Sequence, residues 1–142
     1  MILYIQQEPE GIWIVEQRKK KRFKEQHALA YLRELCLCYG CSMEGRRAAV
    51  KEVCKIKQKV PVLLSERNKD ILFPTAAIKT SSYHWINYRA VKRIKGDQKK
   101  TIVLFFDGSS LELDCDVRCV RREMKICERY LHYLETHQPN KV

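Results

Sequence analysis

Apolar and polar positions in the first 25 residues form two short apolar blocks followed by a charged run. Residues 2–6 and 12–17 are rich in β-branched and aromatic side chains, and a Glu-Pro-Glu-Gly segment separates them. Such blocks bounded by a turn predict a pair of strands. The run from Arg18 to Arg22 consists of lysine and arginine. It fits either a solvated loop or a turn that contacts phosphate.

The apolar spacing becomes helical from Phe23 to about Cys38. The residues that recur at +4, +3 and +4 are Ala28, Leu32, Leu35 and Tyr39. This spacing predicts a helix with one apolar stripe. Gly40 is a suitable C-terminal cap, and Ser42 can cap a second helix that extends to about Ile56.

The middle of the chain predicts strands. Residues 62–66 and 70–75 are apolar runs joined by a polar turn, and residues 83–94 alternate well enough to form one or two strands. Residues 101–106 and 110–114 flank an Asp-Gly pair. This is the clearest hairpin signal in the chain, because Asp-Gly favours the tight turns that join antiparallel strands.

The last predicted element is a helix that begins near Asp114 or Asp116. Its a/d heptad seam consists of Val117, Val120, Met124, Cys127, Leu131 and Leu134. Two interpretations fit this spacing: a helix packed on the sheet, or a helix that joins two copies of the chain.

These elements together predict an α+β fold of mostly antiparallel strands and hairpins, with two helices in the N-terminal half and one C-terminal helix. A length of 142 residues suits a single domain. We expect a strand pair and two helices over 1–60, a β-rich half over 61–115 and the last helix over 116–136.

The net charge of the chain indicates what class of molecule it binds. The formal net charge is +11 and the isoelectric point is near 9.4, which predicts attraction to a polyanion. Nucleic acid is the first expectation, and an anionic membrane surface is the second. No apolar run is long enough to span a membrane, and the N-terminus makes a poor signal peptide. We therefore expect a cytoplasmic protein.

Three cysteines within six residues, with a fourth soon after, raise the question of a metal site. They are Cys36, Cys38, Cys41 and Cys54. Two residues on a helix differ by about 200°, so Cys36 and Cys38 would face opposite sides. The spacing therefore disfavours zinc, and buried cysteine is an ordinary core residue. A redox role for Cys41 near a helix start is a second option. No metal and no cofactor are expected.

Catalysis has little support in the sequence. There is no phosphate-binding loop, no HExxH and no deaminase motif, and the four histidines have no recognisable pairing with cysteine or aspartate. We expect a protein that is not an enzyme.

Two groups of residues are candidates for contacts with nucleic acid. The start of the second helix combines a capped N-terminus with Gly45, Arg46, Arg47 and Lys51, an arrangement suited to phosphate. The second group, in the β-rich half, comprises Lys79, Ser82, His84, Arg89 and Arg93. Here hydroxyls mix with basic side chains, and Arg89 and Arg93 would share one strand face. A solvated basic surface is the alternative for both groups.

In order and spacing, several segments resemble the ComK competence transcription factors. The marks are an aromatic-Gly-x-Ser-x2-Gly-Arg segment, a Val-Pro before a strand, a Leu-Phe-Pro-Thr strand end, a Trp-Ile pair and the late Asp-Gly hairpin. The first mark falls on Tyr39, Gly40, Ser42, Gly45 and Arg46. The resemblance implies a bacterial activator that binds A/T-rich promoter DNA as a dimer or higher oligomer and switches on DNA-uptake genes. Longer members carry a C-terminal region linked to proteolysis through an adaptor, which makes such an adaptor a candidate partner.

The segment from His84 to Met124 is also similar in rhythm to LytTR-type DNA-binding domains. That likeness implies a LytTR-like β module over residues 65–135 that reads DNA with loops. No segment suggests a helix-turn-helix, which agrees with loop-based recognition.

Two other functions remain open at this point. The C-terminal seam could serve a protein-interaction adaptor whose basic charge is incidental. A non-specific binder of RNA or single strands could instead stack bases on Tyr83 and Trp85, although a core position is the alternative for Trp85.

Overall fold

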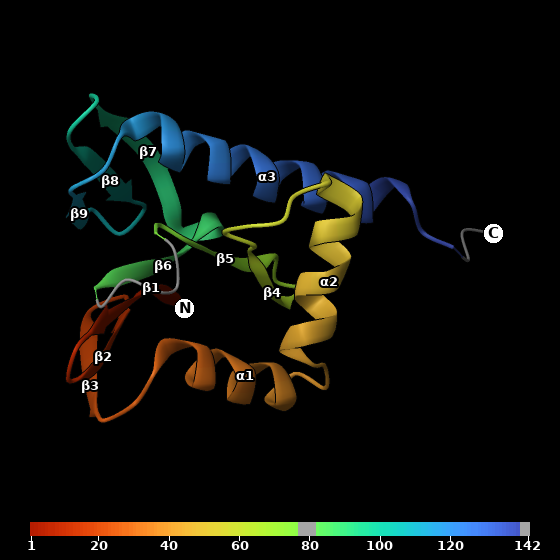
Figure 1. The fold of residues 1–142 in the computed structure, drawn as a ribbon, viewed down its shortest axis with the longest axis horizontal. Coiled ribbons are helices and arrows are strands. Elements are labelled where there is room, and N and C mark those ends of the chain that lie inside the picture. The colour runs from red at the N-terminus through yellow and green to blue at the C-terminus, as the bar shows by residue number, and fades with distance from the viewer. Residues whose placement is uncertain (77–81, 140–142) are drawn as a thin grey trace.

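A computed structural model describes residues 1–76 and 82–139 of the chain. Two antiparallel sheets and three helices make up the described residues (Figure 1). The six-stranded sheet has the order β3-β2-β1-β6-β5-β4 and contains β1 (Ile2–Glu8), β2 (Gly11–Glu16), β3 (Lys19–Lys24), β4 (Val62–Ser65), β5 (Asp70–Pro74) and β6 (Tyr83–Asn87). The smaller sheet has the order β7-β8-β9 and contains β7 (Val91–Gly96), β8 (Thr101–Phe105) and β9 (Ser110–Leu113).

Strand β1 occupies the middle of the larger sheet because it is apolar on both faces. It pairs with β2 along one edge and with β6, about eighty residues later in the chain, along the other. Leu3 and Tyr4 enter one hydrophobic cluster, whereas Ile5 enters the other. The first strand therefore links the two halves of the sequence within one sheet.

Helices cover both faces of this sheet. Helix α1 (Ala28–Cys38) lies on one face and helix α3 (Val117–Thr136) on the other (Figure 1). Ala28, Leu32 and Cys36 of α1 are fully buried at the helical spacing of +4. The smaller sheet lies beside α3 and shares its cluster, where the ring of Phe105 stacks on Tyr4 with centroids 5.6 Å apart.

Helix α2 (Met43–Cys54) packs beside the edge strand β4 and spans both clusters. Met43, at its start, joins the α1 side, whereas Val50 and Cys54 join the α3 side. The turn before it uses Gly40 at a φ of 77°, a left-handed conformation that glycine adopts without strain. Both caps expected from the sequence, Gly40 and Ser42, are confirmed.

The C-terminal helix packs its apolar stripe against its own chain. Val117, Val120 and Cys127 are buried, while Met124, Leu131 and Leu134 are partly buried against the same cluster. Packing on the sheet is therefore the correct interpretation of the seam. A polar substitution at Met124 or Leu131 would disturb the core, so these positions do not form a free adaptor surface.

The predicted α+β class with mostly antiparallel strands is confirmed, but three details were wrong. The basic run forms strand β3, which pairs with β2 over its whole length. Helix α1 consequently begins at Ala28 instead of Phe23. Phe23 lies in β3, and the centroid of its ring is 5.9 Å from that of Tyr31 in α1. Residues 65–135 do not form a separate LytTR-like module, because β5 and β6 belong to the sheet of β1. In the part of the chain that the structure describes, no helix is long and apolar enough to span a membrane.

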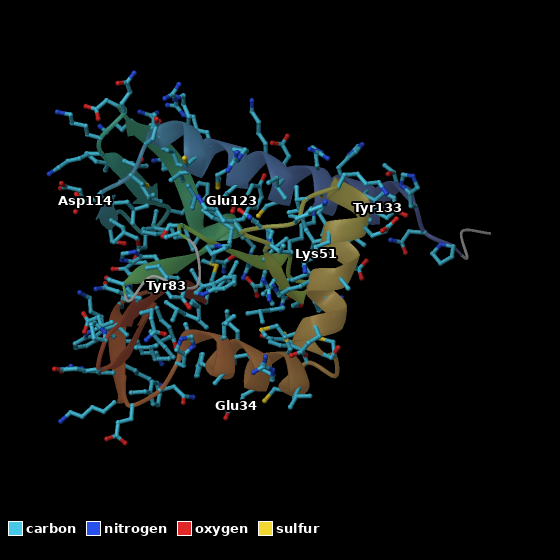
Figure 2. All side chains as sticks on the ribbon, in the orientation of Figure 1. Glu34, Lys51, Tyr83, Asp114, Glu123 and Tyr133 are labelled. Carbon is cyan, nitrogen blue, oxygen red and sulfur yellow. The ribbon has the colours of Figure 1, made fainter. Side chains whose placement is uncertain are left out.

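Glu123 is a residue of α3 whose acidic side chain is buried in the protein core (Figure 2). It is 3% exposed, and neither carboxylate oxygen has a hydrogen-bond partner within the described residues. Burial raises the pKa of Glu123 to about 8, although Lys59 and Arg122 act in the opposite direction. The thiol of Cys127 also lies close by.

We predict that Glu123→Met raises the free energy of unfolding by about 1–3 kcal/mol at pH 8, because it removes an unpaired buried carboxylate. The folded state holds a proton between about pH 4.5 and 8 that the unfolded chain releases, so this carboxyl makes wild-type stability fall as the pH rises through that window. Urea unfolding at pH 5 and pH 8 measures both effects. The variant should lose this component of the pH dependence, whereas Glu128→Met, at an exposed position of α3, should keep it. An unchanged pH dependence in Glu123→Met would contradict the assignment.

Asn87, at the end of β6, joins neighbouring strands of the larger sheet through side-chain hydrogen bonds. Its amide donates to the Ile2 carbonyl at 2.9 Å and to the Asp70 carboxylate at 3.1 Å, and its carbonyl accepts from the Arg89 N–H at 3.2 Å. The side chain is 1% exposed.

We predict that Asn87→Ala lowers the free energy of unfolding by about 2 kcal/mol, because these buried groups lose their partners. Asn68→Ala in the exposed β4–β5 turn is the matched control. Equal urea midpoints for the two variants would contradict this role.

Candidate nucleic-acid interface

The two arginines at the start of α2 are less accessible than the sequence suggested. Arg46 and Arg47 lie on the same stripe as the buried residues Met43 and Val50, and both are half-buried. The Nε atom of each is buried without a hydrogen-bond partner in the described residues. Both arginines are therefore only partly open to solvent, and their contact with DNA phosphates stays a prediction.

Gly45 serves the helix cap instead of making room for a ligand. Its N–H donates to the Ser42 hydroxyl at 3.0 Å, and a Cβ at this position would lie 2.8 Å from that oxygen. A larger residue would therefore press on the cap that starts α2.

Lys51 is exposed on the outer face of α2 (Figure 2). That face also carries acidic residues: Glu44 pairs with Arg33 of α1 at 2.8 Å, and Glu52 pairs with Lys55 at 3.0 Å. Helices α1 and α2 are joined by four residues including Gly40, the connection length of a helix-turn-helix, although the sequence had suggested no such unit. The mixed charge of α2 nevertheless makes it a weak phosphate-binding surface.

The second predicted group is dispersed by the fold. Lys79 lies outside the described residues, and Ser82 is exposed just before β6. Burial lowers the pKa of His84 to about 4, so this half-buried imidazole is neutral and cannot act as a cation at pH 7. Arg89 lies in the 3-10 turn η1 (Tyr88–Ala90), not on the strand with Arg93, and its guanidinium pairs with the Asp70 carboxylate at 3.0 Å. Of this group, Arg93 remains as an exposed cation that makes no ion pair with a described residue.

Arg93 is one of seven exposed cations carried by three joined elements: β7, the turn after it and α3. We call this the β7–α3 surface; its members are Lys92, Arg93, Lys95, Lys99, Arg121, Arg122 and Lys125. All seven are in the described part of the chain, and none forms an ion pair there. The guanidinium of Arg121 donates to the Ile94 carbonyl at 3.4 Å, which joins the helix to the strand. Nitrogen-tipped side chains project into solvent from these elements in Figure 2.

The α3 part of this surface was missed in the sequence, although a signal was present. Between the seam residues, basic residues recur at +4, +3 and +4, namely Arg118, Arg122, Lys125 and Arg129, of which Arg122 and Lys125 belong to the β7–α3 surface. This spacing places them along one side of a helix. The sequence interpretation considered only the apolar stripe.

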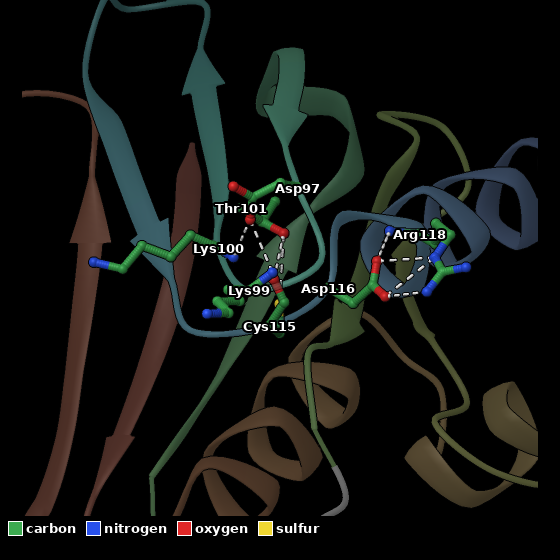
Figure 3. A network of polar contacts seen from close by, with 7 residues as sticks. All are labelled: Asp97, Lys99, Lys100, Thr101, Cys115, Asp116 and Arg118. Atoms are coloured by element: carbon green, nitrogen blue, oxygen red, sulfur yellow. Dashed lines mark hydrogen bonds and ion pairs between the residues drawn. The ribbon is translucent and has the colours of Figure 1, made fainter.

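Hydrogen bonds fix the β7–β8 turn against the start of α3 (Figure 3). The Asp97 carboxylate accepts from the N–H groups of Lys99 at 2.8 Å and Lys100 at 3.0 Å, and these bonds lower its pKa. The Asp97 carbonyl accepts from the Val117 N–H at 3.0 Å, and the Asp116 carboxylate caps α3 through the Arg118 N–H at 2.9 Å. The β7–β8 turn, which carries Lys99, is thus held by hydrogen bonds to the start of α3.

Strand β3 is a second basic region, at the free edge of the larger sheet. All six residues are exposed, and the ion pairs Lys19–Glu16 at 3.5 Å and Arg22–Glu10 at 3.4 Å occupy two of its cations. The guanidinium of Arg22 also lies over the Trp13 ring, 5.5 Å from its centroid. Charged residues on an edge strand oppose pairing with other sheets, which gives this run a structural purpose.

Tyr83 and Trp85 are core residues and cannot stack on a nucleic-acid base. Tyr83 is 2% and Trp85 0% exposed, and their rings meet edge to face with centroids 6.5 Å apart. The hypothesis of a single-strand binder therefore loses the two aromatic residues on which it depended.

The four N-terminal cysteines do not meet at one point. Cys36 is buried with α1, Cys38 is exposed, and Cys54 belongs to the opposite cluster, so the predicted divergence of Cys36 and Cys38 is confirmed. Within residues 1–76 and 82–139, no three metal-ligating side chains gather at one place. Burial, with the neighbouring Cys41, raises the pKa of Cys36 to about 12, so its thiol stays protonated.

Comparisons with known proteins support the resemblance found in the sequence. The model of the family described as ComK protein matches residues 1–138. A curated competence transcription factor of Bacillus subtilis (strain 168) is 35% identical over 79 residues. The match covers 55% of this chain and 41% of that relative, so the chain spans about two fifths of the relative's length. No solved structure matches the chain significantly.

We predict that a thiol-alkylating reagent modifies Cys38 in the folded protein long before Cys36 or Cys127. The latter two are 0% exposed, and burial raises the pKa of both thiols. Peptide mass spectrometry after timed alkylation measures the order, and alkylation in urea is the control that should remove it. Simultaneous protection of Cys36, Cys38, Cys41 and Cys54 would contradict the structure and indicate a shared metal.

Proposed function

Because the chain belongs to the ComK family, we propose that it is a DNA-binding transcriptional regulator that activates competence genes. Its target is double-stranded promoter DNA rich in A/T base pairs, bound by a dimer or higher oligomer. The family match and the curated relative support the regulatory role. The net charge of +11 supports a polyanionic partner.

The observation that carries this proposal is the β7–α3 surface. Its seven cations have no ion-pair partner among the described residues, so they retain their full charge for phosphates. Arginine suits this task because its planar fork of donors matches a phosphate group. Binding would release the counterions condensed on the duplex, and affinity should therefore fall steeply with salt.

The same surface contains the element best placed to read bases. The β7–β8 turn is short, polar and held to α3 by the Asp97 and Val117 backbone contact. A fixed turn beside phosphate-binding cations can enter a groove at low entropic cost, since it is already ordered. Phosphate contacts would set the position of the protein, and the turn would contribute to sequence preference.

We predict that replacing Arg93, Arg121 and Arg122 together by glutamine lowers the slope of log affinity against log salt concentration by about 2–3. Each lost phosphate contact contributes about 0.9 to that slope on duplex DNA. Fluorescence anisotropy with an A/T-rich duplex at several salt concentrations gives the slope. The matched control replaces Lys19, Lys21 and Lys24 of β3 by glutamine, which removes the same charge from the edge strand of the larger sheet.

The proposal fails if the control lowers the slope and the β7–α3 variant does not. Sequence preference is tested with the wild-type chain at one salt concentration, using A/T-rich duplex, G/C-rich duplex and single-stranded competitors. Equal affinity for the two duplexes would contradict specific promoter binding. Preference for the single strand would favour the alternative of a non-specific single-strand binder.

A further inference from the structure

Among the described residues, Arg46 forms no ion pair, and its Nε atom has no hydrogen-bond partner. Arg46 is half-buried, and its Nε atom is enclosed. Glu66 is the acidic residue that lines the same cavity as Arg46, and the two form no ion pair. Because that Nε atom has no accessible surface, a ligand would meet Arg46 at its two terminal guanidinium nitrogens, which are not among the buried atoms without a partner.

Arg46 is one of the residues that line a cavity of about 510 Å³ that is wide open to solvent. The cavity lies between the α1–α2 turn and the end of β4, and its walls are Tyr39, Arg46, Leu64, Ser65, Glu66 and Arg67. In Figure 1 the start of α2 and β4 lie on the side of the molecule opposite to β7, β8 and β9. The cavity is therefore separate from the β7–α3 surface.

The walls of the cavity carry the donors that a phosphate group needs. Arg67 is exposed in the β4–β5 turn and, like Arg46, makes no ion pair with a described residue. The Ser65 hydroxyl accepts from the Asn68 N–H at 3.2 Å and keeps its own hydrogen free to donate. The one acidic wall residue is Glu66, so two guanidinium groups leave a net positive charge. Two guanidinium groups, which donate charge-assisted hydrogen bonds, favour the oxygens of a phosphate group over a neutral ligand.

The remaining walls suit the body of a small organic molecule. The Tyr39 side chain is 49% exposed at the mouth, and the Leu64 side chain forms an apolar wall. A volume of about 510 Å³ is within the range of small-molecule sites, which extends from about 300 to 1,000 Å³. An aromatic ring beside a pair of arginines can stack a flat group while the arginines hold its phosphate.

We propose that this cavity binds a phosphate monoester of about the size of a nucleoside monophosphate. Arg46 and Arg67 hold the phosphate, and Tyr39 packs on the attached flat group. Such a ligand would join the α1–α2 turn to β4. The site is independent of DNA binding by the β7–α3 surface, so either proposal can fail alone.

The test is a thermal unfolding titration with two probes, inorganic phosphate and AMP, against chloride at matched ionic strength. A ligand that binds only the folded chain raises the melting temperature in a saturable way. We expect saturation in the wild type, with AMP effective at lower concentration than phosphate. Arg46→Gln and Arg67→Gln should each weaken the apparent affinity by about tenfold, the effect of losing one charge-assisted contact.

Arg47→Gln is the matched control, since it changes the next half-buried arginine of α2, which does not line the cavity. It should keep the wild-type response. Arg67→Gln changes an exposed turn residue, so its result stands even if Arg46→Gln folds poorly. No saturable response in the wild type, or an equal loss in Arg47→Gln, would overturn the proposal.

Measuring duplex binding by the same variants distinguishes a small phosphate compound from a backbone phosphate of DNA as the ligand. We expect Arg46→Gln and Arg67→Gln to bind A/T-rich duplex as the wild type does. If neither phosphate nor AMP binds and both variants lose duplex affinity, the cavity holds a backbone phosphate of DNA, and the small-molecule site is refuted.

Discussion

The pairing of β1 with β6 is the constraint on which the rest of the structure depends. Tyr4 lies opposite Ile86, and Ile5 opposite Trp85, at the centre of the six-stranded sheet. The side chains of β1 enter both hydrophobic clusters, so this strand must have a neighbour on each edge and a layer on each face. This long-range pairing brings residues about eighty positions apart into one sheet, and it determines where the helices can pack.

The position of the charges follows from that arrangement. Helix α1 takes one face, while α3 and the smaller sheet take the other, and α2 closes the edge at β4. Many of the basic residues lie exposed on β3, on β7 with its turn, and on α3. Two of these elements, β7 with its turn and α3, are joined by hydrogen bonds, from the Val117 N–H to the Asp97 carbonyl and from the Arg121 guanidinium to the Ile94 carbonyl. A rigid group of unpaired cations is a better phosphate template than an edge strand in which Lys19 and Arg22 already form ion pairs.

Much of the fold could be predicted from local patterns, and the failures have physical causes. The caps at Gly40 and Ser42, the Asp-Gly hairpin and the α3 stripe are local signals, and the structure agrees with them. Strand β3 was not predicted because its six exposed residues carry no apolar period, and only pairing with β2 makes it a strand. The half-burial of Arg46 and Arg47 was also hidden, since it depends on which side of α2 meets the sheet. The basic side of α3 could have been found from its +4, +3, +4 spacing.

The central claim is that duplex DNA binds the β7–α3 surface. Amide chemical shifts of the isotope-labelled chain, followed during titration with an A/T-rich duplex, test it most directly, because they locate the contact without a substitution. The account predicts that the largest shifts fall in residues 91–100 and 117–125. Shifts concentrated in residues 19–24 of β3, or in residues 43–55 of α2, would contradict it.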